Sequence, residues 1–375
     1  MSTVIFRLLT LGGNMTKESN HLSPKRKPSL NDVAKEAGVS AMSVSRFLNA
    51  RRRMELASET RARIELAIQK LAYAPSPFAR KRSAREKFTF GLLTSLSKEI
   101  MKSGYHMGIL GGIVDRVFHT GHAIKFFHYA DRPYDRLEDI FYQQGVDGLL
   151  IITWRMEPSL IRLVEKATPI LPLVIFNDFN PDLKTNILYT DVREGMKTAV
   201  SYLVGKGYRK IGLIKAPSEV LFTNSGTSGT ILSVDIREKL NGFLEGLKNE
   251  HLSVKKSWIR ECPSYHESDA YEVMKSWIHE KNLPQAILCT NDEMAMGVLK
   301  ALKEAKLWCP EKIALMGFDD IDRGRFTSPS LTTMRQPLHQ MGEDAVDLLI
   351  DRVQYPENKQ IQKKYSAELV IRQTA

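Results

Sequence analysis

Hydrophobic residues near the amino end of the chain recur at helical spacing. The i, i+3, i+4, i+7 repeat of an amphipathic helix is met by Leu30, Val33, Ala34 and Ala37. Ser29 is a suitable N-cap, and Asp32 places a negative charge in the first turn. Gly38 can adopt a positive φ where this helix ends. The pattern therefore predicts a short helix that stops at a tight turn.

A second helix is expected directly after this turn. Ser40 can cap it, and its inner face consists of Val44, Phe47 and Leu48. The outer face consists of Ala41, Met42, Ser45, Arg46 and Asn49. Its side chains are small, polar or basic, which suits the major groove of DNA. The pair has the size of a DNA-reading helix-turn-helix, although an ordinary helical hairpin shows the same pattern.

The pattern changes further along the chain. A third helix is predicted from about Ser58 to Ala72, and Pro75 lies just beyond its end. From Phe88 onward, strand-like apolar runs alternate with helical ones, which is typical of parallel α/β layers. We expect strands at 89–94, 123–128, 148–153, 173–176, 187–189, 210–215, 286–290 and 313–317. We expect helices at 108–119, 136–144, 158–166, 193–205, 236–249, 268–279 and 292–305.

Charge is concentrated in the predicted helical module. Residues 1–90 hold 18 Lys/Arg and 7 Asp/Glu, whereas residues 91–375 hold 36 of each, so the net charge of +11 lies entirely in the first part. Arg51–Arg53 and Arg80–Arg82 are the main basic clusters. A small basic module on a neutral body is the electrostatic pattern of a protein that binds the phosphate backbone of nucleic acid.

Composition narrows the class of protein further. The chain is 43% apolar and 26% charged, which is typical of a globular protein with two or three domains. The three cysteines are widely spaced, which indicates a reducing cytoplasm and predicts neither a disulfide framework nor a metal site. We find no apolar run of membrane-spanning length and no phosphate-loop, HExxH or GxSxG motif, so we expect no cofactor, no membrane partner and no enzyme. Met15 is a candidate start of translation.

Several segments resemble the LacI/GalR family of bacterial transcription regulators. They are DVAKEAGVSAMSVSRFLN at 32–49, TRARIELAIQKLAYAPSPFAR at 60–80, GVDGLLI at 145–151, YLVGKGYRKIGLI at 202–214, AILCTNDEMAMGVLKAL at 286–302, IALMGFDD at 313–320, LTTMRQP at 331–337 and LVIRQT at 369–374. The resemblance covers about residues 28–375. It implies a repressor or activator whose operator affinity is controlled by a small molecule.

The resemblance also implies a domain organisation. Residues 1–27 would be a disordered extension, 28–74 a helix-turn-helix domain that reads a palindromic operator, and 75–87 a hinge that enters the minor groove. The core, 88–375, would resemble a periplasmic sugar-binding protein with parallel sheets. Its two subdomains would be 88–190 plus the helix 336–353, and 191–330 plus 360–375, joined by three crossing strands. The chain stops soon after its last strand, so we expect a homodimer and not a tetramer.

The resemblance assigns positions at the DNA interface. Ala41, Met42 and Arg46 would face the bases, although Met42 packing under Val39 is an alternative. Further DNA contacts are expected from Ser29, Ser40, Ser45, Asn49, Arg51, Arg80 and Arg82. Arg82 stands where the family has a leucine wedge; it can lie along a narrow minor groove or merely face solvent or phosphate.

Effector-binding residues follow from the resemblance in the same way. The matching positions are Asn177, Lys239, Tyr265, Asn291 and Asp319. Amides, a carboxylate, a cation and an aromatic ring suit the hydroxyls of a saccharide or sugar phosphate. Lys239 stands where the family has arginine. As an alternative to binding an effector, Lys239 and Asp319 can pair with each other or cap helices. A periplasmic-type sugar-binding protein without gene regulation remains the rival class, but it would lack residues 29–73.

Overall fold

The chain divides into two compact units, residues 1–79 and 80–375. The computed structural model describes residues 29–48, 56–71, 87–94, 101–128, 145–152, 158–168, 171–176, 183–224 and 227–375. The predicted extension 1–27, the helix 136–144 and nearly all of the hinge 75–87 lie outside these ranges. No helix of the described ranges has the length and apolar character needed to cross a membrane.

The first unit is a three-helix module. Its helices are α1 (Leu30–Ala37), α2 (Ala41–Leu48) and α3 (Ser58–Lys70). They enclose a small core of Val33, Ala34, Ala37, Val44, Phe47, Ile64 and Ala67. An exposed ion pair from Lys70 to Glu36, 2.6 Å long, also joins α3 to α1. The apolar spacing of the sequence therefore predicted this module correctly.

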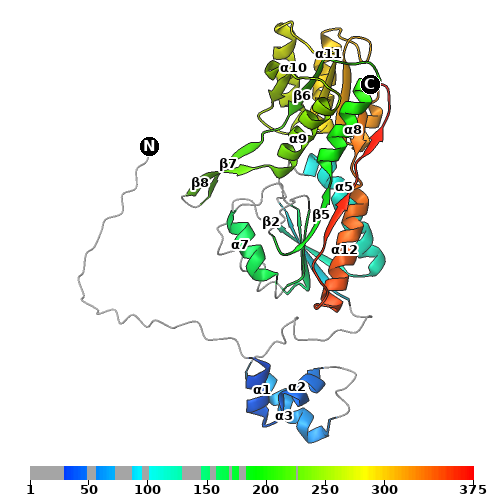
Figure 1. The fold of residues 1–375 in the computed structure, drawn as a ribbon. Helices are drawn as coiled ribbons and strands as arrows, with labels where there is room; N and C mark the ends of the chain where they lie inside the picture. Colours follow the sequence, from blue (N-terminus) through cyan, green and yellow to red (C-terminus); the bar gives the residue numbers. More distant parts are fainter. Residues whose placement is uncertain are drawn as a thin grey trace, which may run out of the picture. The chain divides into compact units, whose positions relative to one another are not determined.

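The second unit begins with a six-stranded sheet. Its strand order is β13 (Gln362–Tyr365), β5 (Asn186–Thr190), β4 (Leu173–Phe176), β3 (Gly148–Ile152), β1 (Thr89–Thr94) and β2 (Ala123–His128), all parallel. Alternate residues point to opposite faces. One face packs on α5 (Gly104–Thr120) and α12 (Leu338–Gln354), and the other packs on α7 (Pro158–Ala167). Figure 1 shows α12 lying along α5.

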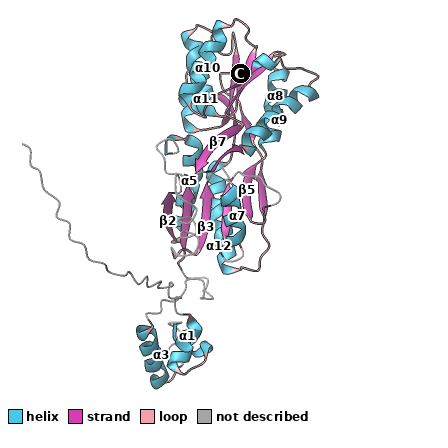
Figure 2. Ribbon diagram, turned by 90° about the vertical axis from the view of Figure 1, so that its left-hand side faces the viewer, coloured by secondary structure: helices cyan, strands magenta, loops and turns pink. Residues whose placement is uncertain are grey.

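A second six-stranded sheet has the order β14 (Glu368–Val370), β12 (Thr332–Arg335), β11 (Ala314–Asp319), β10 (Ala286–Cys289), β6 (Ile211–Lys215) and β9 (Ile259–Glu261). Only β14 is antiparallel. One face is covered by α8 (Val192–Gly205) and α9 (Val234–Asn249), the other by α10 (Glu267–His279) and α11 (Asp292–Glu304). Figure 2 shows the two helix pairs on opposite sides of the strands.

Shorter elements complete the second subdomain. A hairpin of β7 (Glu219–Asn224) and β8 (Thr227–Leu232) forms a separate two-stranded sheet, and the 3-10 helices are η3 (Lys256–Trp258) and η4 (Asp322–Phe326). The sequence did not predict this hairpin, β9, β12 or β13. β9, β12 and β13 are three or four residues long and contain few apolar residues, so they lack the apolar runs by which the other strands were found.

In its described part, the chain passes between the two sheets three times, after β5, between β12 and α12, and between β13 and β14. The sequence assigned 360–375 wholly to the second subdomain, and this is wrong for β13, which pairs with β5 of the first sheet. The polar run Gln362–Tyr365 contains no signal for the sheet it joins. The helix predicted to begin at 336 begins at Leu338, which leaves Gln336 in the second crossover.

Candidate functional site

The helix-turn-helix is built by local hydrogen bonds. The Ser29 hydroxyl accepts from the Asp32 amide at 3.3 Å, and the Asp32 carboxylate accepts from the Ser29 amide at 2.6 Å. This reciprocal arrangement is a capping box. Gly38 ends α1 with a φ of 61°, and its amide donates to backbone carbonyls of the preceding turn. Ser40 accepts from the Ser43 amide at 3.1 Å, so the second cap also forms as predicted.

The outer face of α2 presents an apolar side chain to solvent. Met42 is 66% exposed, so it does not pack inward beneath Val39. Ala41 is partly buried against the module core, and Ser29 and Ser40 are used as caps. The side chains of Ser45 and Arg46, and the whole of Asn49, Arg51, Arg80 and Arg82, lie outside what the structure describes. Their contacts with DNA stay predictions.

In the second unit, Lys239 occupies a buried position on α9. Its ammonium group lies 3.0 Å from the Asp235 carboxylate one turn earlier and donates to the Thr290 carbonyl at 2.9 Å. It also lies 4.4 Å from the centre of the Phe318 ring. Burial lowers the pKa of Lys239, but the charges of Asp235 and Asp319 outweigh burial, so the net shift is upward. Lys239 is therefore a charged group held in place by the protein itself.

Asp319 lies at the end of β11, where parallel strands present ligand-binding groups. Its φ of 122° is strained for a side-chain-bearing residue. The carboxylate accepts a 2.7 Å hydrogen bond from the Gln336 side-chain amide. Burial raises the pKa of Asp319 well above its usual range, and the nearby Lys239 only partly offsets this. The shift favours the neutral form of Asp319, because burial disfavours the negative charge more than Lys239 stabilises it.

Gln336 leaves one hydrogen-bonding atom unused. The residue is 4% exposed, and its side-chain oxygen has no hydrogen-bond partner within the described residues. A buried acceptor without a partner is costly, and a ligand that donates a hydrogen bond would remove the cost. Gln336 was not among the predicted effector-binding residues, because it fell inside the helix predicted over residues 336–353.

Two other predicted effector residues are already engaged. The Asn291 side-chain oxygen caps α11 by accepting from the Met294 amide at 2.7 Å, and its nitrogen donates to the Tyr265 carbonyl at 3.1 Å. The Tyr265 hydroxyl donates to Ser233 at 3.3 Å. Asn291 thus holds the segment that carries Tyr265, which places the asparagine in a structural role. Its contact with an effector stays a prediction, and Asn177 lies outside the described residues.

Tyr105, in the first turn of α5, joins this cluster from the other subdomain. Burial raises the pKa of Tyr105 well above its usual range, and the charges of Asp235 and Asp319 add to the shift. Tyr105 therefore lies within electrostatic reach of both carboxylates. Beside the first crossover, a cavity of about 240 Å³ is also bordered by Asp235. Tyr105 and Asp235 carried no sequence signal, because only the fold brings α5 next to α9. We call Tyr105, Asp235, Lys239, Asp319 and Gln336 the cleft cluster.

Comparison with known proteins agrees with both units. Residues 29–76 match the family model of bacterial regulatory proteins of the lacI family, and residues 200–375 match a periplasmic binding protein-like domain. The HTH-type transcriptional repressor PurR of Klebsiella pneumoniae (strain 342) is 31% identical over 328 residues, which cover 86% of this chain and 90% of that protein. The chain belongs to the LacI family of bacterial regulatory proteins.

Solved structures give the same fold. A complex of the transcriptional regulator CelR with cellobiose superposes with a TM-score of 0.67 at 22% identity and covers 93% of this chain and 100% of its own. The lac repressor dimer bound to operator and the anti-inducer ONPF gives 0.65 at 24% identity, with 93% and 99% covered. This LacI-family protein is thus a DNA-binding transcriptional regulator controlled by a small-molecule ligand, and its fold class is as predicted.

Proposed function

We propose that this LacI-family regulator is a repressor whose effector is a saccharide bound at the cleft cluster. The observation that carries the proposal is the unused side-chain oxygen of Gln336, which is buried beside the Asp319 carboxylate. A sugar hydroxyl both donates and accepts hydrogen bonds, so it can satisfy this oxygen. The phenol rings of Tyr105 and Tyr265 supply flat apolar surface for a sugar ring. The cellobiose bound by the CelR relative supports the same ligand class.

On the DNA side, we propose that the exposed face of α2 enters the major groove of a palindromic operator. Met42 offers an apolar group for thymine methyls, and Arg46, the basic residue of α2, suits guanine or phosphate. Palindromic recognition requires two copies of the module. In the second unit, exposed apolar side chains on α5 and on the edge strand β2, such as Phe118 at 80% exposure and Phe126 at 45%, are compatible with a homodimer surface.

A gel-shift assay tests the DNA-binding part. Purified full-length protein should shift DNA from the region upstream of its own gene and should leave a scrambled fragment unshifted. Replacing Arg46 with alanine should weaken operator binding by about 1–3 kcal/mol if the arginine reads a base. An unchanged affinity in the folded variant would remove Arg46 from the reading surface.

Calorimetry tests the effector site. A saccharide that raises the melting temperature of the wild type should bind the Asp319→Asn variant at least about tenfold more weakly, because asparagine replaces one of the two carboxyl oxygens with an N–H donor. Asp322→Asn is a matched control, since the Asp322 side chain is 83% exposed and its replacement should leave saccharide affinity unchanged. Full saccharide binding by Asp319→Asn would place the effector elsewhere.

A further inference from the structure

Helix α5 begins without a cap of its own. Its N-cap residue, Ser103, makes no side-chain hydrogen bond to the first turn. The amide of Gly104 instead donates at 3.0 Å to the carboxylate of Glu293, which belongs to α11 of the other subdomain. A carboxylate at a helix amino terminus is favoured by the unpaired amides and by the helix dipole. The start of α5 is therefore capped from across the boundary between the subdomains.

The approach of the two segments is close enough to require glycine. A β-carbon at Gly104 would lie 2.8 Å from the β-carbon of Ile321, which is inside van der Waals contact. Ile321 is itself fixed, because its amide donates to the buried carboxylate of Asp292 at 2.8 Å. The first turn of α5 thus rests against a rigid part of the second subdomain, directly beside the Glu293 contact.

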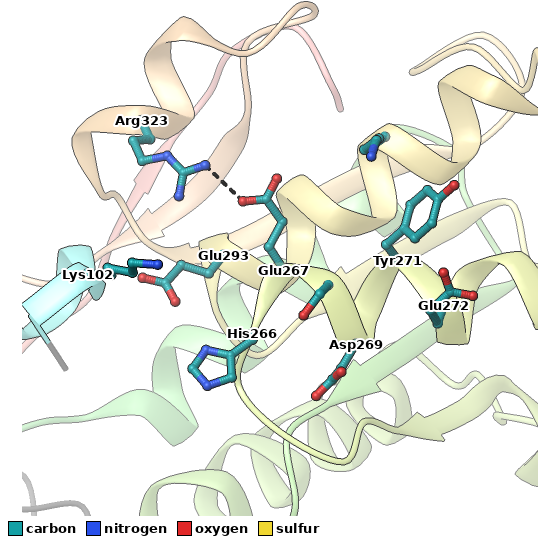
Figure 3. A pocket seen from close by; sticks show the side chains of 10 residues that line it. Lys102, His266, Glu267, Asp269, Tyr271, Glu272, Glu293 and Arg323 are labelled. Carbon is teal, nitrogen blue, oxygen red and sulfur yellow. Dashed lines mark hydrogen bonds and ion pairs between the residues drawn. The ribbon is translucent and has the colours of Figure 1, made fainter. Parts of the chain in front are cut away.

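Glu293 lies among charged groups that come from both subdomains. It lies on a cavity of about 680 Å³ whose border includes Lys102, His266, Glu267 and Arg323. Figure 3 shows the Lys102 side chain, from the first subdomain, pointing toward Glu293, while Arg323 is paired with Glu267 at 2.8 Å. Burial raises the pKa of Glu293, and the hydrogen bond from the Gly104 amide and the nearby cations His266 and Arg323 offset this only in part.

The residue after Gly104 is Tyr105 of the cleft cluster. Whatever fixes the position of the Gly104 amide also fixes Tyr105, which lies within electrostatic reach of Asp235 and Asp319. We propose that Glu293 is a positioning residue for the effector site: it caps α5 from the other subdomain and so holds Tyr105 in place beside the other residues of the cleft cluster. This inference rests on the proposed function for the identity of the site, but the contact itself can be tested without an effector.

The experiment compares full-length wild type with four variants. Glu293→Ala removes the cap, whereas Glu293→Gln keeps an oxygen that can accept from the Gly104 amide. Glu267→Ala is the matched control, because this carboxylate borders the same cavity but pairs with Arg323 of the second subdomain. Gly104→Ala attacks the same contact from the other side, since its β-carbon would push the helix start away from Ile321.

The first measurement is hydrogen–deuterium exchange over residues 104–110. Exchange should accelerate at least about tenfold in Glu293→Ala and Gly104→Ala, and should stay within about threefold of wild type in Glu293→Gln and Glu267→Ala. Unchanged exchange in both Glu293→Ala and Gly104→Ala overturns the proposal. If one of these two variants fails to fold, the other gives the answer.

The second measurement is calorimetry with cellobiose and with glucose. If the wild type binds either sugar, Glu293→Ala should bind it about tenfold more weakly, and Glu293→Gln should restore most of the affinity. Equal affinity in wild type and Glu293→Ala overturns the positioning role. If the wild type binds neither sugar, the saccharide proposal loses its support, while the exchange data still decide whether Glu293 caps α5.

Discussion

Replacing Lys239 with methionine should strongly destabilise the second subdomain. Methionine keeps the volume of the side chain but removes the ammonium group that lies 3.0 Å from Asp235 and 2.9 Å from the Thr290 carbonyl. Removing one partner of a buried ion pair costs about 3–5 kcal/mol, because the remaining charge is left uncompensated. The Asp235 side chain is 30% exposed, so water screens part of this cost. We therefore expect a loss of about 3 kcal/mol at neutral pH.

The loss should depend on pH. Burial already raises the folded-state pKa of Asp319 above its unfolded value, so stability from this group is present at low pH and falls as pH rises through the folded pKa. Without Lys239 the pKa of Asp319 rises further. The variant should consequently lose more stability at pH 8 than at pH 5, where the carboxyl is already closer to its neutral form.

Urea unfolding followed by tryptophan fluorescence measures this effect. Three of the four tryptophans, Trp258, Trp277 and Trp308, belong to the second subdomain, so most of the signal reports on the region that contains Lys239. Lys300→Met is the matched control, because Lys300 is a 61% exposed lysine on α11 whose removal should cost no more than about 0.5 kcal/mol. A loss below about 1 kcal/mol for Lys239→Met, or an equal loss at both pH values, would refute the reasoning.

Three further predictions concern packing, pH and DNA. Gly112→Ala should lower the free energy of unfolding by about 1–3 kcal/mol in a thermal unfolding assay, because its β-carbon would lie 1.9 Å from the His339 carbonyl oxygen. Gly111→Ala is the control and should be nearly neutral, since the nearest atom to its β-carbon would be 3.6 Å away. Burial raises the pKa of Asp292 to about 7, so the free energy of unfolding of the wild type should fall between pH 5 and 8. In urea titrations, Asp292→Asn should make the free energy of unfolding less dependent on pH, and an unchanged pH dependence contradicts this prediction. Arg82→Leu should alter the salt dependence of operator binding and the bend angle in a gel-shift assay, and the minor-groove role fails if both stay the same.

Local chemistry let the sequence predict the DNA-binding module accurately. The capping box of Ser29 and Asp32, the positive φ of Gly38 and the cap at Ser40 each depend on residues within a few positions of one another. Such bonds join residues that are close in the sequence, so a local pattern can predict them. The buried strands were predicted for a related reason, because a parallel strand covered on both faces is almost continuously apolar, as β3 and β4 are.

The candidate effector site was only partly predictable. Lys239 and Asp319 were selected through resemblance to a family, and the structure brings them into one cluster. Asn291 was selected in the same way, yet its amide is used to cap α11 and to hold Tyr265. A sequence position identifies a side chain but not its hydrogen-bond partners, so a capping asparagine and a ligand-binding asparagine look alike.

The sequence by itself determined the type of each apolar element, the turns and caps of the first unit, and the concentration of positive charge in residues 1–90. Only the tertiary structure decided that β13 joins the first sheet, that Gln336 reaches Asp319 from a crossover, and that Glu293 caps a helix of the other subdomain. The physical reason is the range of the interactions. Caps and hydrophobic periodicity act over a few residues, whereas Gly104 and Glu293 are 189 positions apart and meet only because two sheets are connected by three crossovers.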